Sequence, residues 1–66
     1  MKNNVISKWS EFDEQIKKAI LNYPALKNTK LAIKLDTIYF NSKLDKYEID
    51  SLRNYISRNR ATLTEP

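Results

Sequence analysis

The stretch KLDKYEIDSLRNYISRNR, residues 43–60, contains the sharpest helix-start signal in this 66-residue chain. Asp45 can accept a hydrogen bond from the backbone of Glu48, whose side chain can return one, and this reciprocal pair is a capping box. Leu44 and Ile49 occupy the two positions of a hydrophobic staple around the same start. Two independent local signals therefore predict that a helix begins here.

The residues that follow extend this helix. Ile49, Leu52 and Ile56 recur at helical spacing and form a narrow apolar stripe. We expect the helix to cover about residues 45–60, and we expect ATLTEP, residues 61–66, to fray.

A second apolar face runs along NNVISKWSEFDEQIKKAILNY, residues 3–23. Its members recur at spacings of 3 and 4 and are Val5, Trp9, Phe12, Ile16, Ala19 and Tyr23, with Ile20 beside them. This periodicity predicts a helix over about residues 4–23, which ends at Tyr23 because a residue that precedes proline is disfavoured in the α region. The helix can start near Asn3 or Asn4, or at Ser10 with Asp13 three residues later.

The middle segment, LKNTKLAIKLDTIYFNS (residues 26–42), allows two interpretations. A helix over about residues 29–40, capped by Asn28 or Thr29, would have two apolar surfaces. Its main face would hold Leu31, Ala32, Leu35, Ile38 and Tyr39, with Ile33 and Phe40 nearly opposite. The alternation of Leu31, Ile33 and Leu35, followed by TIYF, instead suggests a short hairpin in residues 30–41. We favour the helix, because the chain has no glycine for a hairpin turn.

These segments predict an all-α fold: a single small domain, residues 1–66, of three helices. Such a domain is compatible with a helix-turn-helix-like arrangement. The alternative is an α+β domain with the hairpin described above. No repeat or linker divides the chain.

The composition limits the function. The chain has no cysteine and no histidine, which removes the commonest general base and most transition-metal ligands. We therefore expect a binding protein and not an enzyme, without a metal or another cofactor. No apolar run approaches the roughly 20 residues that span a bilayer, and the N-terminus does not resemble a signal peptide. We expect a cytoplasmic protein with no membrane association.

The net charge of +4 and the isoelectric point near 9.5 favour an anionic partner. Our leading hypothesis is a protein that binds double-stranded DNA, such as a transcriptional regulator or an accessory factor of phage or plasmid type. The candidate nucleic-acid-binding residues are Lys27, Lys30 and Lys34 in the middle segment, and Arg53, Asn54, Ser57, Arg58 and Arg60 in the last helix. These side chains can reach phosphates and base edges, although the same pattern also fits solvated helix faces.

The alternative hypothesis is a protein-interaction module, such as an inhibitor or adaptor. It would present an apolar and aromatic surface made of Ile33, Tyr39, Phe40 and Tyr47 to a partner protein. Because so short a chain buries only about 60% of its surface, we also expect a homodimer.

Overall fold

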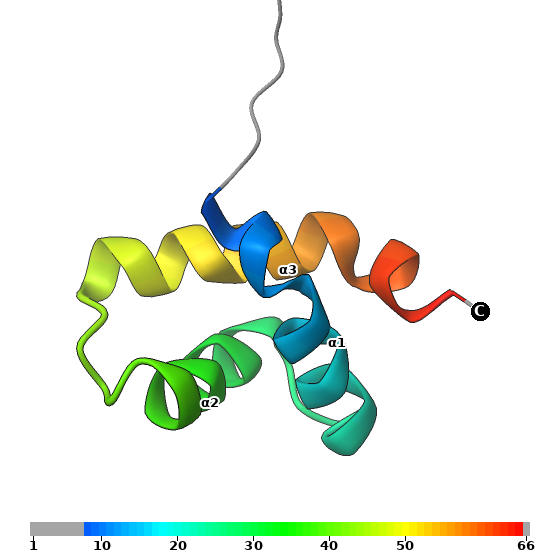
Figure 1. The fold of residues 1–66 in the computed structure, drawn as a ribbon, viewed down its shortest axis with the longest axis horizontal. Helices are drawn as coiled ribbons and strands as arrows, with labels where there is room; N and C mark the ends of the chain where they lie inside the picture. The colour runs from blue at the N-terminus through cyan, green and yellow to red at the C-terminus, as the bar shows by residue number, and fades with distance from the viewer. Residues whose placement is uncertain (1–7, 66) are drawn as a thin grey trace, which may run out of the picture.

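The computed structural model describes residues 8–65, which form one 3-10 helix and three α-helices (Figure 1). The elements are η1 (Lys8–Phe12), α1 (Asp13–Asn22), α2 (Asn28–Tyr39) and α3 (Lys46–Thr64). The all-α prediction is confirmed, and the alternative hairpin in residues 30–41 is wrong, because α2 occupies that segment. No strand occurs within the described range.

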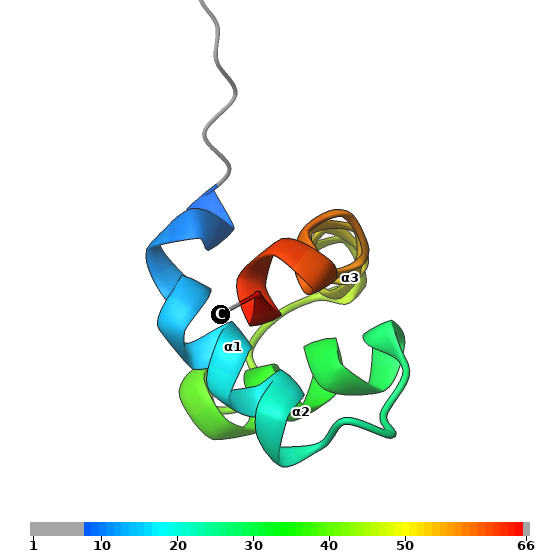
Figure 2. The same cartoon turned by 90° about the vertical axis from the view of Figure 1, so that its right-hand side faces the viewer.

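The longest helix, α3, lies along one side of the molecule, and η1 and α1 cross it while α2 packs beneath it (Figures 1 and 2). The three α-helices meet around one apolar core, to which each of them and η1 contribute. The buried apolar residues are Trp9, Ile16, Ala19, Ile20, Leu31, Ala32, Leu35, Leu52 and Ile56. All of them belong to the apolar patterns read from the sequence.

The first helix differs from its predicted form. Residues 8–12 adopt the tighter 3-10 geometry, and the α-helical part begins at Asp13 after the N-cap Phe12, which makes no side-chain capping bond. The proposed cap at Ser10 is therefore wrong, because Ser10 lies within η1. The alternative start near Asn3 or Asn4, and Val5, lie outside the described residues.

The prediction for α3 is correct at its start and too short at its end. Asp45 Oδ1 accepts the backbone N–H of Glu48 at 2.8 Å, and Glu48 Oε1 accepts that of Asp45 at 3.4 Å, so the capping box is present. The helix continues to Thr64 instead of ending at Arg60. Leu63 packs against the core, and this tertiary contact stabilises an extra turn that local propensity does not predict.

Three aromatic rings close one end of the core. Phe40 meets Phe12 edge-on at a centroid distance of 5.0 Å and meets Trp9 at 6.0 Å. The expectation that Phe40 shares an outward surface with Ile33 is wrong, because Phe40 is the C-cap of α2 and its backbone has left the helical path. Trp9 also donates its indole N–H to Ser51 Oγ at 3.0 Å, which joins η1 to α3.

The connection between α2 and α3 is organised by a buried carboxylate. Asp36, only 7% exposed, accepts the backbone N–H of Leu44 on its Oδ1 at 3.1 Å. Its main-chain oxygen accepts the N–H groups of Phe40 and Ser42. Residues 40–45 make this connection, which is longer than the three- or four-residue turn of a compact helix-turn-helix motif.

Candidate nucleic-acid interface

The outward side of α2 and its N-cap carry one continuous polar and basic stripe, which we call the lysine face. It consists of Lys27, Lys30, Ile33, Lys34 and Thr37. From residue 30 onward the spacing is i, i+3, i+4 and i+7, which places these side chains on one side of a helix. The opposite side of α2 holds the buried Leu31, Ala32 and Leu35. Lys30 and Lys34 therefore line one side of α2, and Lys27 precedes them at the N-cap.

The lysine face has few acidic neighbours in the sequence: between Lys27 and Thr37 the one acidic residue is Asp36, whose buried side chain accepts the N–H of Leu44. Residues 15–35 contain five lysines and no aspartate or glutamate. Lys17 and Lys18, in α1, are also exposed. Within the described range, none of the five lysines forms an ion pair, since the two salt bridges found there join Lys8 to Glu48 and Arg53 to Asp50. The positive charge of this segment is free to act on an external anion.

The start of α2 adds to this positive character. Its N-cap, Lys27, makes no side-chain capping bond, and its first turn has no acidic residue. The predicted caps Asn28 and Thr29 are wrong, because both lie inside the helix. By contrast, α1 and α3 both have acidic side chains in their first turns, and α3 also has its capping box. The positive end of the α2 dipole thus reinforces the charge of the lysines.

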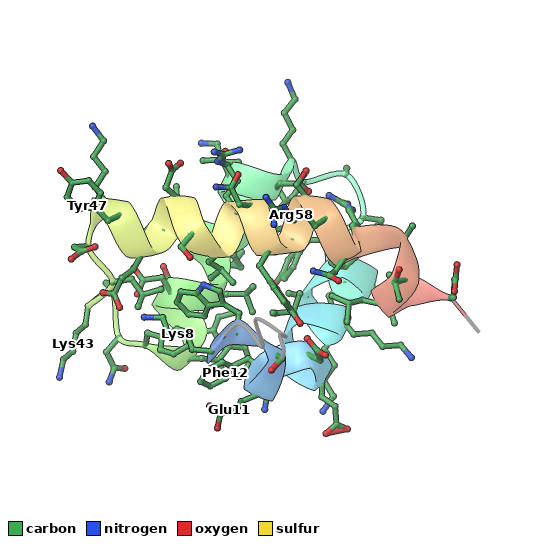
Figure 3. All side chains as sticks on the ribbon, turned by 90° about the horizontal axis from the view of Figure 1, so that it is seen from above. Lys8, Glu11, Phe12, Lys43, Tyr47 and Arg58 are labelled. Atoms are coloured by element: carbon green, nitrogen blue, oxygen red, sulfur yellow. The ribbon has the colours of Figure 1, made fainter. Side chains whose placement is uncertain are left out.

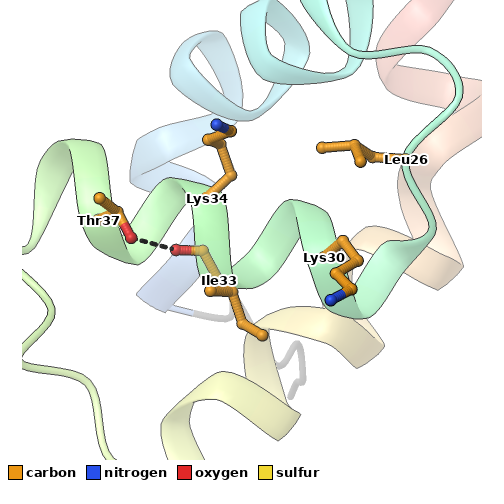
Figure 4. Close-up of a pocket in the computed structure, with 5 residues that line it drawn as sticks. All are labelled: Leu26, Lys30, Ile33, Lys34 and Thr37. Atoms are coloured by element: carbon orange, nitrogen blue, oxygen red, sulfur yellow. Dashed lines mark hydrogen bonds between the residues drawn. The ribbon is translucent and has the colours of Figure 1, made fainter.

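A shallow hollow of about 280 Å³ lies against the lysine face (Figure 4). Leu26 and Ile33 give it an apolar character, and Lys30, Lys34 and Thr37 complete its lining. In Figure 4, Lys34 points toward α1, whereas Lys30 and Ile33 leave α2 in the other direction. The Lys34 ammonium lies 4.8 Å from the centroid of the Tyr23 ring, a cation–π contact that holds it beside the end of α1.

The polar residues predicted on α3 occupy different surroundings. Arg53 is half-buried and donates through Nε and Nη2 to Asp50 Oδ1, at 3.2 and 3.0 Å. Asn54, Ser57 and Arg58 are exposed. Arg58 lies on the upper surface of α3 in Figure 3, and it makes no hydrogen bond or ion pair with any residue in the 8–65 range.

Arg60 binds within the protein. Its Nη1 donates to the carbonyl of Leu26 at 3.0 Å and to Asn28 Oδ1 at 2.9 Å, and its Nη2 donates to the carbonyl of Pro24 at 3.0 Å. The guanidinium therefore fastens α3 to the connection before α2. No signal in the sequence links residue 60 to residues 24–28, so this function could be found only in the folded chain.

The lysine face and Arg58 do not form one surface. Leu31 and Leu35 of α2 are buried in the same core as Leu52 and Ile56 of α3, and the lysines and Arg58 lie on the other sides of these two helices. Figure 3 accordingly shows Arg58 on α3 with α2 behind that helix. The two groups of predicted residues point in different directions.

The proposed protein-interaction residues are also dispersed. Ile33 and Tyr39 are 45% and 43% exposed, and Tyr47 is 83% exposed. Phe40 instead packs into the aromatic end of the core. Ile33 belongs to the lysine face, whereas Tyr47 lies in the first turn of α3. These four residues therefore do not form one continuous surface.

Two titratable groups show clear electrostatic effects away from the lysine face. The hydrogen bond from Lys8 at 2.9 Å, together with the backbone N–H of Asp45, lowers the pKa of Glu48 below its usual value. The pKa of Tyr55 is raised to about 12, mainly because burial removes its hydroxyl from water and also because the hydroxyl donates a hydrogen bond to Asp13. Glu48 connects α3 to Lys8 of η1, and Tyr55 connects α3 to Asp13 of α1, so both groups stabilise the packing of the helices.

In the described part of the chain, no three histidine, cysteine, aspartate or glutamate side chains come together in a way that could hold a metal ion. None of its helices combines the length and apolar character needed to cross a membrane. No protein-family model, curated protein sequence or solved structure matches this chain.

Proposed function

We propose that this chain is a small DNA-binding domain that uses the lysine face of α2 to bind the phosphates of a duplex. The observation that carries the proposal is the uninterrupted positive segment, residues 15–35, whose five lysines form no ion pair within the described range. Such a domain would suit a regulator of transcription or an accessory factor of a DNA transaction.

The mechanism is electrostatic. Each lysine that meets a phosphate releases condensed counterions, so binding is favourable at low salt and weakens steeply as salt rises. The stripe from Lys27 to Thr37 is about 15 Å long at the helical rise of 1.5 Å per residue. That length corresponds to about four base pairs, so one helix face can contact phosphates on neighbouring nucleotides.

A role for α3 is secondary in this proposal. Arg58 makes no hydrogen bond or ion pair within residues 8–65, and Asn54 and Ser57 are exposed, so these side chains can bind DNA that bends around the domain or a second segment of DNA. We leave Arg60 out of the proposed interface, because its donors are bound to Pro24, Leu26 and Asn28.

The test is a fluorescence-anisotropy titration of a mixed-sequence duplex at several salt concentrations. The variant K27Q/K30Q removes two charges from the lysine face. The matched control K43Q/K46Q removes two exposed charges near the start of α3. We expect K27Q/K30Q to reduce the slope of log K against log salt by about 2, while the control changes it little.

Two results would contradict the proposal. Failure of the wild-type protein to bind the duplex even at low salt would show that the lysine face is a solvated surface. Alternatively, both double variants could weaken binding equally, which would mean that net charge alone, and not this helix face, attracts DNA.

A second candidate function follows from the apolar side chains that remain at the surface. Tyr47 is 83% exposed, and Ile38 and Tyr39 are 48% and 43% exposed. Tyrosine is enriched at binding hot spots, so these residues favour a protein-interaction module or a homodimer. Light scattering at micromolar concentrations tests the dimer: a dimer mass that Y47S and Y39S convert to a monomer supports it, and a monomeric wild type excludes it.

A further inference from the structure

Ile33 is an exposed apolar residue within a positive surface. Its side chain is 45% exposed, and it lines the shallow hollow together with Lys30 and Lys34. An isoleucine gains nothing from a phosphate oxygen, which is charged and strongly hydrated. If the lysine face binds DNA, this side chain must meet a part of the duplex that is apolar.

The major groove offers such a group. Thymine presents its C5-methyl there, and the apolar contact with this methyl is one of the ways in which proteins distinguish bases. In the minor groove the A·T pair presents only hydrogen-bond acceptors. An apolar side chain beside lysines therefore fits the floor of the major groove better than that of the minor groove.

The dimensions of α2 agree with this placement. A helix is about 10–12 Å across, and the major groove is about 12 Å wide. Lys34 points toward α1, whereas Lys30 leaves the helix in the other direction (Figure 4). When the lysine face is turned into the groove, Lys34 can reach the phosphates on one side. Lys30 and Ile33 leave α2 in the same direction (Figure 4), so Ile33 can meet base edges near the other side, where Lys30 reaches the phosphates.

The local structure also holds Ile33 and Thr37 in place. The Thr37 hydroxyl donates to the main-chain oxygen of Ile33 at 3.0 Å, so its proton is already used. A β-branched side chain in a helix has one strongly preferred χ1 rotamer, so Ile33 can be buried against a base at little cost in conformational freedom. Both residues are exposed.

We propose that α2 lies in the major groove of DNA and that Ile33, with Thr37 one turn later, contacts thymine methyl groups. This inference rests on the proposed function and adds the groove, the base and the residue that reads it. It also assigns base recognition to the middle helix and not to α3.

The test compares two duplexes that differ only in the thymine methyl groups. One is an A·T-rich duplex, and the other has the same sequence with uracil in place of thymine. We expect the wild-type protein to bind the thymine duplex about fourfold more tightly for each methyl that it buries. The variant I33A should lose the part of this preference that Ile33 supplies and keep only the part that Thr37 supplies, and circular dichroism should show that it keeps its helical fold.

K30Q is the matched comparison on the same face. It should weaken binding to both duplexes and leave the preference for thymine unchanged. Equal binding of the two duplexes by the wild-type protein would overturn the inference, as would an I33A variant that keeps the full preference of the wild type. Failure of the inference is distinguishable from failure of the proposed function, because steep salt dependence on the uracil duplex would still support phosphate binding.

Discussion

Tyr55 in α3 donates its hydroxyl hydrogen to Asp13 Oδ1 in α1 across a distance of 2.5 Å, although the two residues are 42 positions apart in the chain. Asp13 is the first residue of α1, where a negative charge is also favoured by the helix dipole. One carboxylate thus stabilises the start of its own helix and fastens that helix to α3.

The Tyr55–Asp13 bond predicts a specific loss of stability in alkaline solution. The pKa of Tyr55 is about 12 in the folded protein and about 10 in the unfolded chain. Above pH 10 the unfolded chain releases this proton first, so the contribution of Tyr55 is complete below pH 10 and is lost between about pH 10 and 12. Urea denaturation from pH 8 to 11.5 should show a steeper decline for the wild type than for Y55F.

The comparison with Y55F isolates this effect, because both proteins share their other tyrosines and their lysines. Parallel pH profiles for the two proteins would contradict the assignment.

Substitution of Arg60 should affect stability more than substitution of Arg58. Arg60 donates three hydrogen bonds that join α3 to the connection before α2, and bonds from charged groups contribute about 1.5–3 kcal/mol. We expect R60A to lower the free energy of unfolding by about 2–3 kcal/mol and R60K to restore only part of it, since lysine lacks the planar fork. The exposed R58A should change stability by less than about 0.5 kcal/mol. Urea denaturation at neutral pH measures all three, and equal effects of R60A and R58A would refute the structural role.

Removal of the Asp36 carboxylate should loosen the connection between α2 and α3. D36A leaves the backbone N–H of Leu44 without its acceptor and should cost about 1–3 kcal/mol. D36N keeps an oxygen at this position and should cost less. Hydrogen exchange of the Leu44 amide gives the local readout: the amide should exchange faster in D36A than in D36N, and identical exchange in the two variants would show that this bond is not protective.

A glycine at position 42 should stabilise the protein. Asn41 and Ser42 have φ angles of 55° and 60°, in the left-handed region that costs a non-glycine residue about 1–2 kcal/mol. Asparagine tolerates this conformation better than serine does. After the larger conformational freedom of glycine in the unfolded chain is subtracted, we expect S42G to gain about 0.5 kcal/mol. S42A retains the Cβ atom and should bring no gain in thermal denaturation, so a comparable gain in both variants would contradict the explanation.

The sequence by itself determined the fold class and most of the core. Periodic apolar residues and the capping box depend on neighbours within one or two helical turns, so they can be read from a single segment. For this reason the start of α3 at Asp45 and the burial of Ile16, Leu35 and Leu52 were predictable. The position of Lys30 and Lys34 on one side of α2 followed from the same helical spacing.

Only the tertiary structure decided how the remaining polar and aromatic groups are used. The sequence pattern places Arg60 in a candidate binding surface, but its guanidinium is hydrogen-bonded to the connection before α2. The same pattern places Phe40 on the outward side of α2, but its ring packs against Trp9 and Phe12. Asp36 became a buried acceptor for the N–H of Leu44. These contacts join parts of the chain that local periodicity treats separately, because a side chain finds its partner only after the helices have packed.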